Sequence, residues 1–280
     1  MNRVARAALA KETLAILTAG EYRLGDGRIV TIADAVKTCV DATQLFRPPD
    51  LAQALEQVLS RPTEMSPGTI QIENESTLAG IANLLRDGSE PVAALNFASA
   101  KNPGGGFLTG SQAQEESLAR SSALHASLMN AWEFYEQHRQ DSSPLYSDSI
   151  ILSPNCPVFR DDAGNLLSAV HYTTFISAAA PNAGALSDTR SNDLYRVPEV
   201  FERRAEYVLA VAALQGYRHV VLGAWGCGVF RNDPRMVASV FMKLLHSSRW
   251  KNRFSRVIFS ILDPSPQQAL VQMFKNIAIE

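Results

Sequence analysis

The first 60 residues carry apolar positions at helical spacing, interrupted by turn signals. Apolar residues recur every three or four positions from Val4 to Leu17 and stop at Gly20, and Asn2 precedes them as a capping residue. This pattern predicts a first helix that begins near Asn2 and ends at Gly20. Two short extended runs around a glycine-containing turn then predict a small hairpin over residues 22–30.

Two further helices are predicted before residue 60. Thr31 can cap a second helix that reaches about Leu45. The run Pro48-Pro49-Asp50 ends that helix, because proline cannot continue it, and starts a third helix over residues 51–59.

Prolines, serine and glycine then gather at residues 61–68, the most linker-like stretch of the chain. We therefore expect a boundary near residue 66. It divides an N-terminal helical extension, residues 1–65, from a larger domain, residues 66–280.

Beyond that boundary, short apolar runs alternate with helical patterns, which is typical of an α/β domain. Strands are predicted at residues 69–72, 92–97, 150–152, 172–178, 219–222 and 257–261. Helices are predicted at residues 78–85, 115–128, 199–215, 234–246 and 267–277.

Composition and charge narrow the class of ligand. Of 280 residues, 46% are hydrophobic and 19% are charged, which is the mixture of a soluble globular protein with a large core. The formal net charge is −2 without a long run of either sign, unlike the basic footprint of a general nucleic-acid binder. A polyanionic ligand would have to be held locally, by backbone N–H groups and a few arginines.

The three cysteines, Cys39, Cys156 and Cys227, are widely spaced, and no cysteine or histidine stands at metal-ligand spacing. The sequence therefore predicts a reducing compartment and no metal. Lysine and glutamate interrupt the apolar pattern of the N-terminus, which lacks the features of a signal peptide or membrane span. We expect a cytoplasmic protein without membrane contact.

The first candidate for chemistry is a glycine triplet that follows an apolar strand. Gly104, Gly105 and Gly106 remove every side chain from this loop, so its backbone can approach a ligand closely and adopt positive φ. Glu115 and Glu116 then stand at the start of a predicted helix. Without a ligand, the same residues are explained by a flexible turn and by an acidic first turn that complements the helix dipole.

A second glycine loop follows a later apolar strand. Gly223, Gly226 and Gly228 stand close together, and Asp233-Pro234 forms a capping and first-turn pair for the next helix. Such a loop can direct several N–H groups at a phosphate, although tight strand–helix packing is the alternative. Its glycines match neither the dinucleotide fingerprint nor the Walker loop. Because both loops follow strands of one predicted sheet, they should face the same crevice.

The triplet Gly104-Gly105-Gly106, followed after seven residues by Gln114-Glu115-Glu116, resembles the signature of poly(ADP-ribose) glycohydrolases. The segments 95–100 and 222–230 resemble the bacterial and fungal branch of that family, which carries an N-terminal helical extension. The resemblance covers most of the chain. It implies a macrodomain-like mixed sheet flanked by helices, with a small N-terminal helical subdomain.

The activity implied by this resemblance is hydrolysis of ribose–ribose O-glycosidic bonds in poly(ADP-ribose), mainly from chain ends, with release of ADP-ribose and without a cofactor. The implied partners are poly(ADP-ribose) or ADP-ribose and ADP-ribosylated proteins, with no direct binding of nucleic acid or membrane. The implied role is the reversal of ADP-ribosylation, as in the DNA damage response.

The resemblance also implies roles for individual residues. Glu116 matches the catalytic acid and base, and Glu115 matches the residue that hydrogen-bonds hydroxyls of the adjacent ribose. The implied substrate-binding residues are Gly104, Gly105 and Gly106 at the distal ribose and neighbouring phosphate, Gly226, Cys227, Gly228 and Val229 at the diphosphate, Phe230 on the terminal ribose, and Gln114. Looser matches add Asn96, Ser99 and Glu75; animal members have aspartate and asparagine in the strand-end motif that contains Asn96 and Ser99.

The expected chemistry constrains how the two glutamates act. Cleavage between riboses passes through an oxocarbenium-like state, so the leaving oxygen must be protonated and positive charge stabilised. Consecutive helical residues point about 100° apart, so Glu115 and Glu116 cannot flank one bond as equals. One of them must therefore be catalytic while the other holds hydroxyls.

Two other functions stay open from the sequence. A reader that binds ADP-ribose without hydrolysis would share the phosphate loop but would not need Glu116, and a hydrolase of another ADP-ribosyl linkage would share every motif. For Cys227, a small residue at a phosphate is favoured over a thiol nucleophile, because its motif holds no histidine. Trp132, Phe134 and Tyr135 cluster where a helix is expected to end, and core packing is favoured over base stacking for them.

Overall fold

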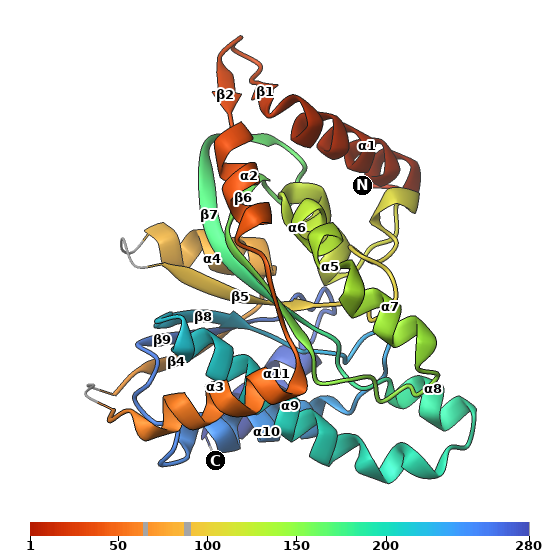
Figure 1. The fold of residues 1–280 in the computed structure, drawn as a ribbon, viewed down its shortest axis with the longest axis vertical. Coiled ribbons are helices and arrows are strands. Elements are labelled where there is room, and N and C mark those ends of the chain that lie inside the picture. Colours follow the sequence, from red (N-terminus) through yellow and green to blue (C-terminus); the bar gives the residue numbers. More distant parts are fainter. Residues whose placement is uncertain (64–66, 87–90, 280) are drawn as a thin grey trace.

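A computed structural model describes residues 1–63, 67–86 and 91–279 of the chain (Figure 1). The main sheet is mixed, with strand order β3-β6-β7-β5-β8-β9-β4, and helices cover both of its faces. Its strands are β3 (Gln44–Phe46), β4 (Thr69–Glu73), β5 (Val92–Phe97), β6 (Ile150–Arg160), β7 (Leu166–Ala178), β8 (His219–Leu222) and β9 (Arg256–Ser260). The expected α/β class, a mixed sheet flanked by helices, is confirmed.

The helices are α1 (Arg3–Ala19), α2 (Ala33–Asp41), α3 (Pro48–Ser60), α4 (Thr77–Arg86), α5 (Gln114–Ser121), α6 (Leu124–Asn130), α7 (Trp132–Gln140), α8 (Ala183–Asp188), α9 (Val197–Leu214), α10 (Pro234–His246) and α11 (Ala269–Ile279). Two 3-10 turns, η1 (Phe107–Thr109) and η2 (Asn192–Arg196), and a hairpin of β1 (Glu21–Arg23) and β2 (Ile29–Thr31) complete the elements. No helix in the described ranges is long and apolar enough to cross a membrane.

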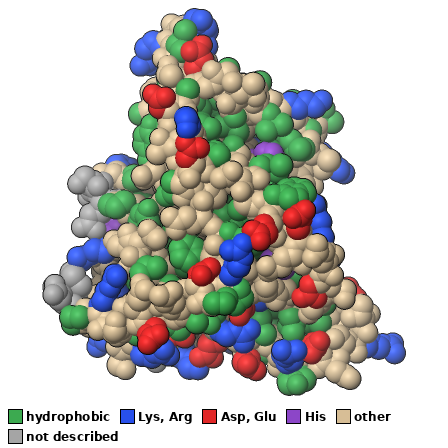
Figure 2. Space-filling view, in the orientation of Figure 1, with side chains coloured by type: hydrophobic (Ala, Val, Ile, Leu, Met, Phe, Trp, Pro, Cys, Tyr) green, Lys and Arg blue, Asp and Glu red, His purple; other side chains and the backbone are tan. Residues whose placement is uncertain are grey.

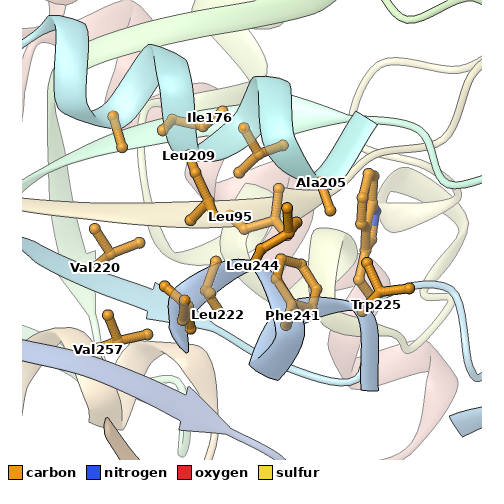
Figure 3. Packing of buried hydrophobic residues seen from close by; sticks show 14 of the residues in the cluster. Leu95, Ile176, Ala205, Leu209, Val220, Leu222, Trp225, Phe241, Leu244 and Val257 are labelled. Atoms are coloured by element: carbon orange, nitrogen blue, oxygen red, sulfur yellow. The ribbon is translucent and has the colours of Figure 1, made fainter. Parts of the chain in front are cut away.

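The central strands are apolar on both faces because both faces are covered. In β5, Leu95 belongs to a hydrophobic cluster shared with α3, α9, α10 and α11, whereas Ala94 belongs to a second cluster shared with α2, α4, α6 and α7. Figure 3 shows Leu95 and Val220 of the sheet facing Leu209 of α9 in the first cluster. Burying such side chains stabilises the fold by about 1.5–3 kcal/mol each.

The first helix and the hairpin form as predicted. The Asn2 side chain accepts the Ala5 N–H at 2.9 Å, and Gly20 ends α1 in the left-handed region with φ 71°. Left-handed backbone at a helix end favours glycine, which explains why the pattern stops there. Strands β1 and β2 then pair antiparallel, as expected.

The prediction for the second helix is wrong at both ends. Thr31 lies in β2, and α2 begins at Ala33 after Ile32, which makes no side-chain cap. The helix ends at Asp41, and Leu45 lies in β3, opposite Ile151 of β6. Pairing along the sheet edge therefore overrides the local helical periodicity.

Residues 1–63 contact the larger part of the fold at several places. Helix α1 packs on η1 and α5, α2 packs on β6, and α3 packs on α9, while β3 extends the main sheet. The predicted boundary near residue 66 lies outside the described residues, and the division into residues 1–65 and 66–280 stays a prediction.

The helix predicted over residues 115–128 is two helices. Ser122 is extended and forms a bridge with Val158, and the Ala123 N–H donates to the Pro157 carbonyl, so the chain pairs briefly with β6 between α5 and α6. Strands β6 and β7 are also longer than expected, and they are joined by a turn in which the Asn165 N–H donates to Asp161 Oδ1. Trp132 begins α7 and does not end a helix.

The glycine loops leave the same edge of the sheet. Strand β5 pairs parallel with β7 and β8, and β9 pairs parallel with β8 and β4. The carboxyl ends of these five strands therefore lie along one edge of the sheet, and both loops leave from that edge, as predicted.

Candidate active site

A cavity of about 1040 Å³ lies at the carboxyl ends of β4, β5, β8 and β9. Glu75 follows β4, Phe97 ends β5, residues 224–230 follow β8, and Ile261 follows β9 in its wall. Figure 2 shows basic and acidic side chains interspersed over the visible face, without an extended region of one sign. An anionic ligand in the cavity would thus be held by local groups.

Glu115 lies buried in the first turn of α5. Its Oε2 atom accepts the Ser99 N–H at 2.7 Å, and its Oε1 atom lies 3.4 Å from the Nδ2 donor of Asn96. Burial, with the charge of Glu116 adding to it, raises the pKa of Glu115 to about 8 against the hydrogen bond from Ser99. Burial therefore favours the protonated form of Glu115.

Glu116 is half-buried and is covered by the glycine triplet. Its Oε1 atom accepts the Gly106 N–H at 3.0 Å. A Cβ atom at Gly105 would lie 2.5 Å from Glu116 Oε1 and 3.3 Å from Glu115 Oε2, and Gly105 has φ 59°. Only glycine fits both this backbone conformation and this close approach to the carboxyl groups.

Gln114 ties the start of α5 to the end of β5. Its Oε1 atom accepts the Phe97 N–H at 2.9 Å, and its Nε2 atom donates to the Leu95 carbonyl at 2.7 Å and to Thr77 Oγ1 at 3.1 Å. These bonds fix the register between helix and strand, and so they fix the position of the two glutamates that follow.

The second loop is closed by Asn232. The Asn232 N–H donates to the Gly226 carbonyl at 3.0 Å, and its side chain donates to the Pro181 carbonyl at 2.9 Å. Gly226 has φ 73°, and a Cβ atom there would lie 2.3 Å from Asn232 Nδ2. Gly228 is different, because no atom lies within 4 Å of the position of its Cβ.

The tip of this loop offers unused donors. Among the described residues, the N–H groups of Gly228, Val229 and Phe230 form no hydrogen bond, and Val229 is 83% exposed. The Phe230 carbonyl accepts the Gly184 N–H at 2.8 Å, which anchors the end of the loop on α8. Asp233 then caps α10 by accepting the Arg235 N–H, as predicted.

Cys227 lies in the same loop without the properties of a nucleophile. Burial, followed by the charge of Asp233, raises the pKa of its thiol to about 12. A thiol of this kind stays protonated at neutral pH, which favours the interpretation of Cys227 as a small residue in the loop.

The predicted site residues fall into two adjoining groups. Those in the cavity wall are Glu75, Gln114, Gly226, Cys227, Gly228, Val229 and Phe230. Those clustered around the two carboxyl groups are Asn96, Ser99, Gly104, Gly105, Gly106, Glu115 and Glu116. Gln114 and Phe97 belong to the cavity wall and hydrogen-bond to each other, so the carboxyl groups lie next to the cavity, outside its described wall.

Sequence reasoning missed part of the cavity wall. Met1 and Arg6 reach it from the N-terminal segment, Asp161 reaches it from the tip of the β6–β7 hairpin, and Leu262 follows β9. Leu262 could have been found, because it stands just beyond the carboxyl end of a predicted strand. Met1, Arg6 and Asp161 carry no local signal, because only tertiary folding brings them to the cavity.

Within the described ranges, no group of three or more His, Cys, Asp and Glu side chains could hold a metal ion. The arrangement is instead a pair of carboxyl groups beside a cavity with unused backbone donors. Fold and site together define an α/β protein with an acid pair beside a cavity whose wall includes a glycine loop with unused backbone donors.

Comparisons with known proteins agree with this class. The family model of the microbial-type PARG catalytic domain, where PARG is poly(ADP-ribose) glycohydrolase, matches residues 10–161. The chain belongs to this family. No curated protein sequence matches the chain.

Three solved structures illustrate the similarity. PARG from Thermomonospora curvata is 44% identical, with a TM-score of 0.93 over 98% of this chain and 100% of that chain. The same protein bound to the inhibitor ADP-HPD has a TM-score of 0.91 at 44% identity, over 98% of this chain and 99% of that chain. PARG from Deinococcus radiodurans in complex with ADP-ribose is 44% identical, with a TM-score of 0.82 over 88% of this chain and 97% of that chain.

Proposed function

We propose that this chain hydrolyses ribose–ribose O-glycosidic bonds of poly(ADP-ribose), mainly from chain ends, and releases ADP-ribose. The observation that carries the proposal is the acid pair covered by Gly104–Gly106 beside a cavity of about 1040 Å³. That volume lies at the upper end of the range for small-molecule sites, which suits a ligand as large as ADP-ribose. The similar PARG structures that contain ADP-ribose and ADP-HPD support the same ligand here.

In this proposal the diphosphate lies against residues 226–229. The unused N–H groups at the loop tip would donate to its oxygens, which compensates for the small net charge of the protein. Phe230 would pack on the terminal ribose, and Gly104–Gly106 would approach the distal ribose. Glu75, which accepts from Ser260 Oγ at 3.1 Å, lies at the ends of β4 and β9 and would contact the adenosine end.

Catalysis would divide between the two glutamates. Glu115 has a partner near each oxygen, at Ser99 and Asn96, and is suited to holding ribose hydroxyls. Glu116 accepts one hydrogen bond through Oε1, and no bond to its Oε2 is found among the described residues. That oxygen is free to give a proton to the leaving ribose oxygen, as the anomeric carbon becomes oxocarbenium-like, and then to take one from the attacking water.

The proposal also says where the activity takes place and which cofactors it does without. Its setting is the reversal of ADP-ribosylation on proteins in the cytoplasm, including after DNA damage. It requires no cofactor and no metal, so treatment with EDTA should leave the rate of hydrolysis unchanged.

The direct test is incubation of the purified chain with poly(ADP-ribose), followed by sizing of the products. Free ADP-ribose is expected as the main early product. A chain that binds ADP-ribose but releases none would be a reader. A chain that leaves the polymer intact but cleaves an ADP-ribosyl ester on protein or nucleic acid would be a hydrolase of another linkage.

A further inference from the structure

One exposed face of α7 lies beside the acid pair and has no role in the proposed catalytic site. Trp132 is 37% exposed there, whereas Trp225 and Trp250 are 0% and 1% exposed. The guanidinium carbon of Arg139 lies 4.5 Å from the centroid of the Trp132 ring. An accessible indole with a stacked guanidinium is a surface on which nucleobases stack.

This face is joined to the loop that covers the carboxyl groups. Arg139 Nε donates to the Lys101 carbonyl at 2.9 Å. Lys101 stands three residues before Gly104, in the segment that leads into the glycine triplet, and the side chains of Lys101 and Arg139 are both exposed. Two positive charges and one indole therefore stand at the outer side of this loop.

Tyr135 is a buried residue of α7 whose ring lies near that of Trp132. Its ring centroid lies 6.1 Å from that of Trp132, and its buried hydroxyl has no hydrogen-bond partner in the described structure. Burial raises the pKa of Tyr135, the charge of Glu115 raises it further, and the charge of Arg139 lowers it. The hydrogen bond from Arg139 to Lys101 places the α7 face next to the segment of the glycine triplet, whose Gly106 N–H is bonded to Glu116.

We propose that Trp132, Arg139 and Lys101, here the α7 patch, bind the ADP-ribose unit on the leaving side of the bond that is cleaved. The adenine of that unit stacks on the Trp132–Arg139 pair, and its diphosphate lies near Lys101 and Arg139. The inference rests on the proposed function, because only a polymer presents a second unit to the site.

The covalent structure of the polymer favours this occupant. In poly(ADP-ribose) the distal ribose of one unit is joined to the adenosine ribose of the next. The leaving oxygen at Glu116 therefore belongs to an adenosine, whose adenine and diphosphate must emerge within one nucleotide of the acid pair. The α7 patch supplies one stacking surface and two cations at this place, which complement one base and one diphosphate.

One acidic neighbour of the patch on α7 is neutralised by an ion pair. Glu133 of the same helix is paired with Arg47 at 2.7 Å. Glu136 is exposed on α7, and among the described residues it forms no ion pair. It stands four residues after Trp132 and three before Arg139, so it lies on the same face of α7 as the patch.

The experiment measures polymer kinetics and ADP-ribose affinity in parallel. Trp132→Ala and Arg139→Gln are expected to raise the KM for poly(ADP-ribose) by about 5- to 100-fold, the range for loss of one stacked base. The calorimetric Kd for free ADP-ribose should stay at the wild-type value, because a single unit occupies only the cavity. Trp132→Phe should restore most of the polymer affinity. Glu133→Gln, which changes a residue paired with Arg47 on another face of α7, should change neither quantity.

Fluorescence gives a readout that does not depend on turnover. In a Glu116→Gln background, polymer should quench tryptophan emission more than ADP-ribose does, and Trp132→Phe should remove the additional quenching. If the wild type releases no ADP-ribose, the proposed function fails, and this titration still tests the patch. If the wild type is active but Trp132→Ala and Arg139→Gln both keep its KM, the proposal for the α7 patch is wrong and the proposed function still stands.

Discussion

Gly105 of the first loop and Gly228 of the second are glycines for opposite reasons. At Gly105 the protein itself occupies the space, because Glu116 Oε1 would lie 2.5 Å from a Cβ atom and φ is 59°. At Gly228 the space is open, because no atom lies within 4 Å of the Cβ position. The first loop is thus shaped around the protein's own carboxyl groups, and the second leaves room for a ligand. A glycine motif in a sequence does not distinguish these two cases.

The largest expected effect on catalysis is that of replacing Glu116, the residue that the first glycine loop covers. Glu116→Gln keeps the size of the side chain but cannot exchange a proton, so kcat for polymer should fall by about 10²–10⁴. The ADP-ribose Kd should stay nearly unchanged, since the lost interaction belongs to the transition state. Product release by the variant at most of the wild-type rate would show that the acid is another residue.

A methyl group on the first loop should disturb catalysis by displacing Glu116. Gly105→Ala strains a left-handed position and displaces Glu116, so kcat should fall on the order of 10²-fold, as for a small misplacement of a catalytic group. The melting temperature should fall as well. Gly228→Ala is the matched control, and its melting temperature should equal that of the wild type. Equal stability and equal kcat in both variants would remove the distinction between the loops.

A bulky residue on the second loop should act on binding alone. Gly228→Leu has room in the free protein, but its side chain would occupy the space proposed for the diphosphate. The Kd for ADP-ribose should rise about ten- to a hundredfold, as for loss of one or two charge-assisted hydrogen bonds. Calorimetry measures the affinity, and thermal melting verifies the fold. An unchanged Kd would place the diphosphate elsewhere.

The smallest expected effect is on the pH dependence of the free energy of unfolding, through the raised pKa of Glu115. Its pKa is raised from 4.5 to about 8, so the folded state keeps a proton that the unfolded state loses between those pH values. This contribution to stability is complete below about pH 4.5 and is lost as pH rises through about 8, with a slope of at most about 1.4 kcal/mol per pH unit.

Glu115→Gln removes this dependence. We therefore expect the free energy of unfolding, measured with urea at pH 5, 7 and 9, to increase for the variant relative to the wild type as the pH rises. The difference isolates Glu115 from groups such as His138, whose pKa is lowered mainly by burial. A constant difference across this range would mean that Glu115 is already ionised in the folded protein at pH 5.

The sequence predicts the part of the fold that is determined locally. Strands β5 and β8 have the predicted bounds, because both are apolar on consecutive positions and end in glycine loops. Strand β3 was missed, because a pattern of only three residues is indistinguishable from the end of a helix. The interruption at Ser122 was also missed, because its cause is a bridge to Val158, which is distant in sequence.

At the site, too, the sequence predicts local motifs but not the residues that only folding brings together. The acid pair and both glycine loops stand in short motifs that resemble a known family, so they could be named in advance. Met1, Arg6 and Asp161 could not, because they join the cavity only when α1 and the β6–β7 hairpin fold over it. The exposure of Trp132 was hidden for a related reason: its neighbours Phe134 and Tyr135 are fully buried, and composition alone groups the three together.

The pairing of β4 with β9 has a consequence for synthesis on the ribosome. Thr69 lies opposite Arg256, so these neighbours in the sheet are made far apart in time. Until β9 emerges, β4 has no partner, and β8 lacks its neighbour on that side. Such non-local pairing slows folding and leaves strand edges open to other chains. The nascent chain therefore depends on residues 256–260 to complete its sheet, and loss of β9 should turn a folding protein into an aggregating one.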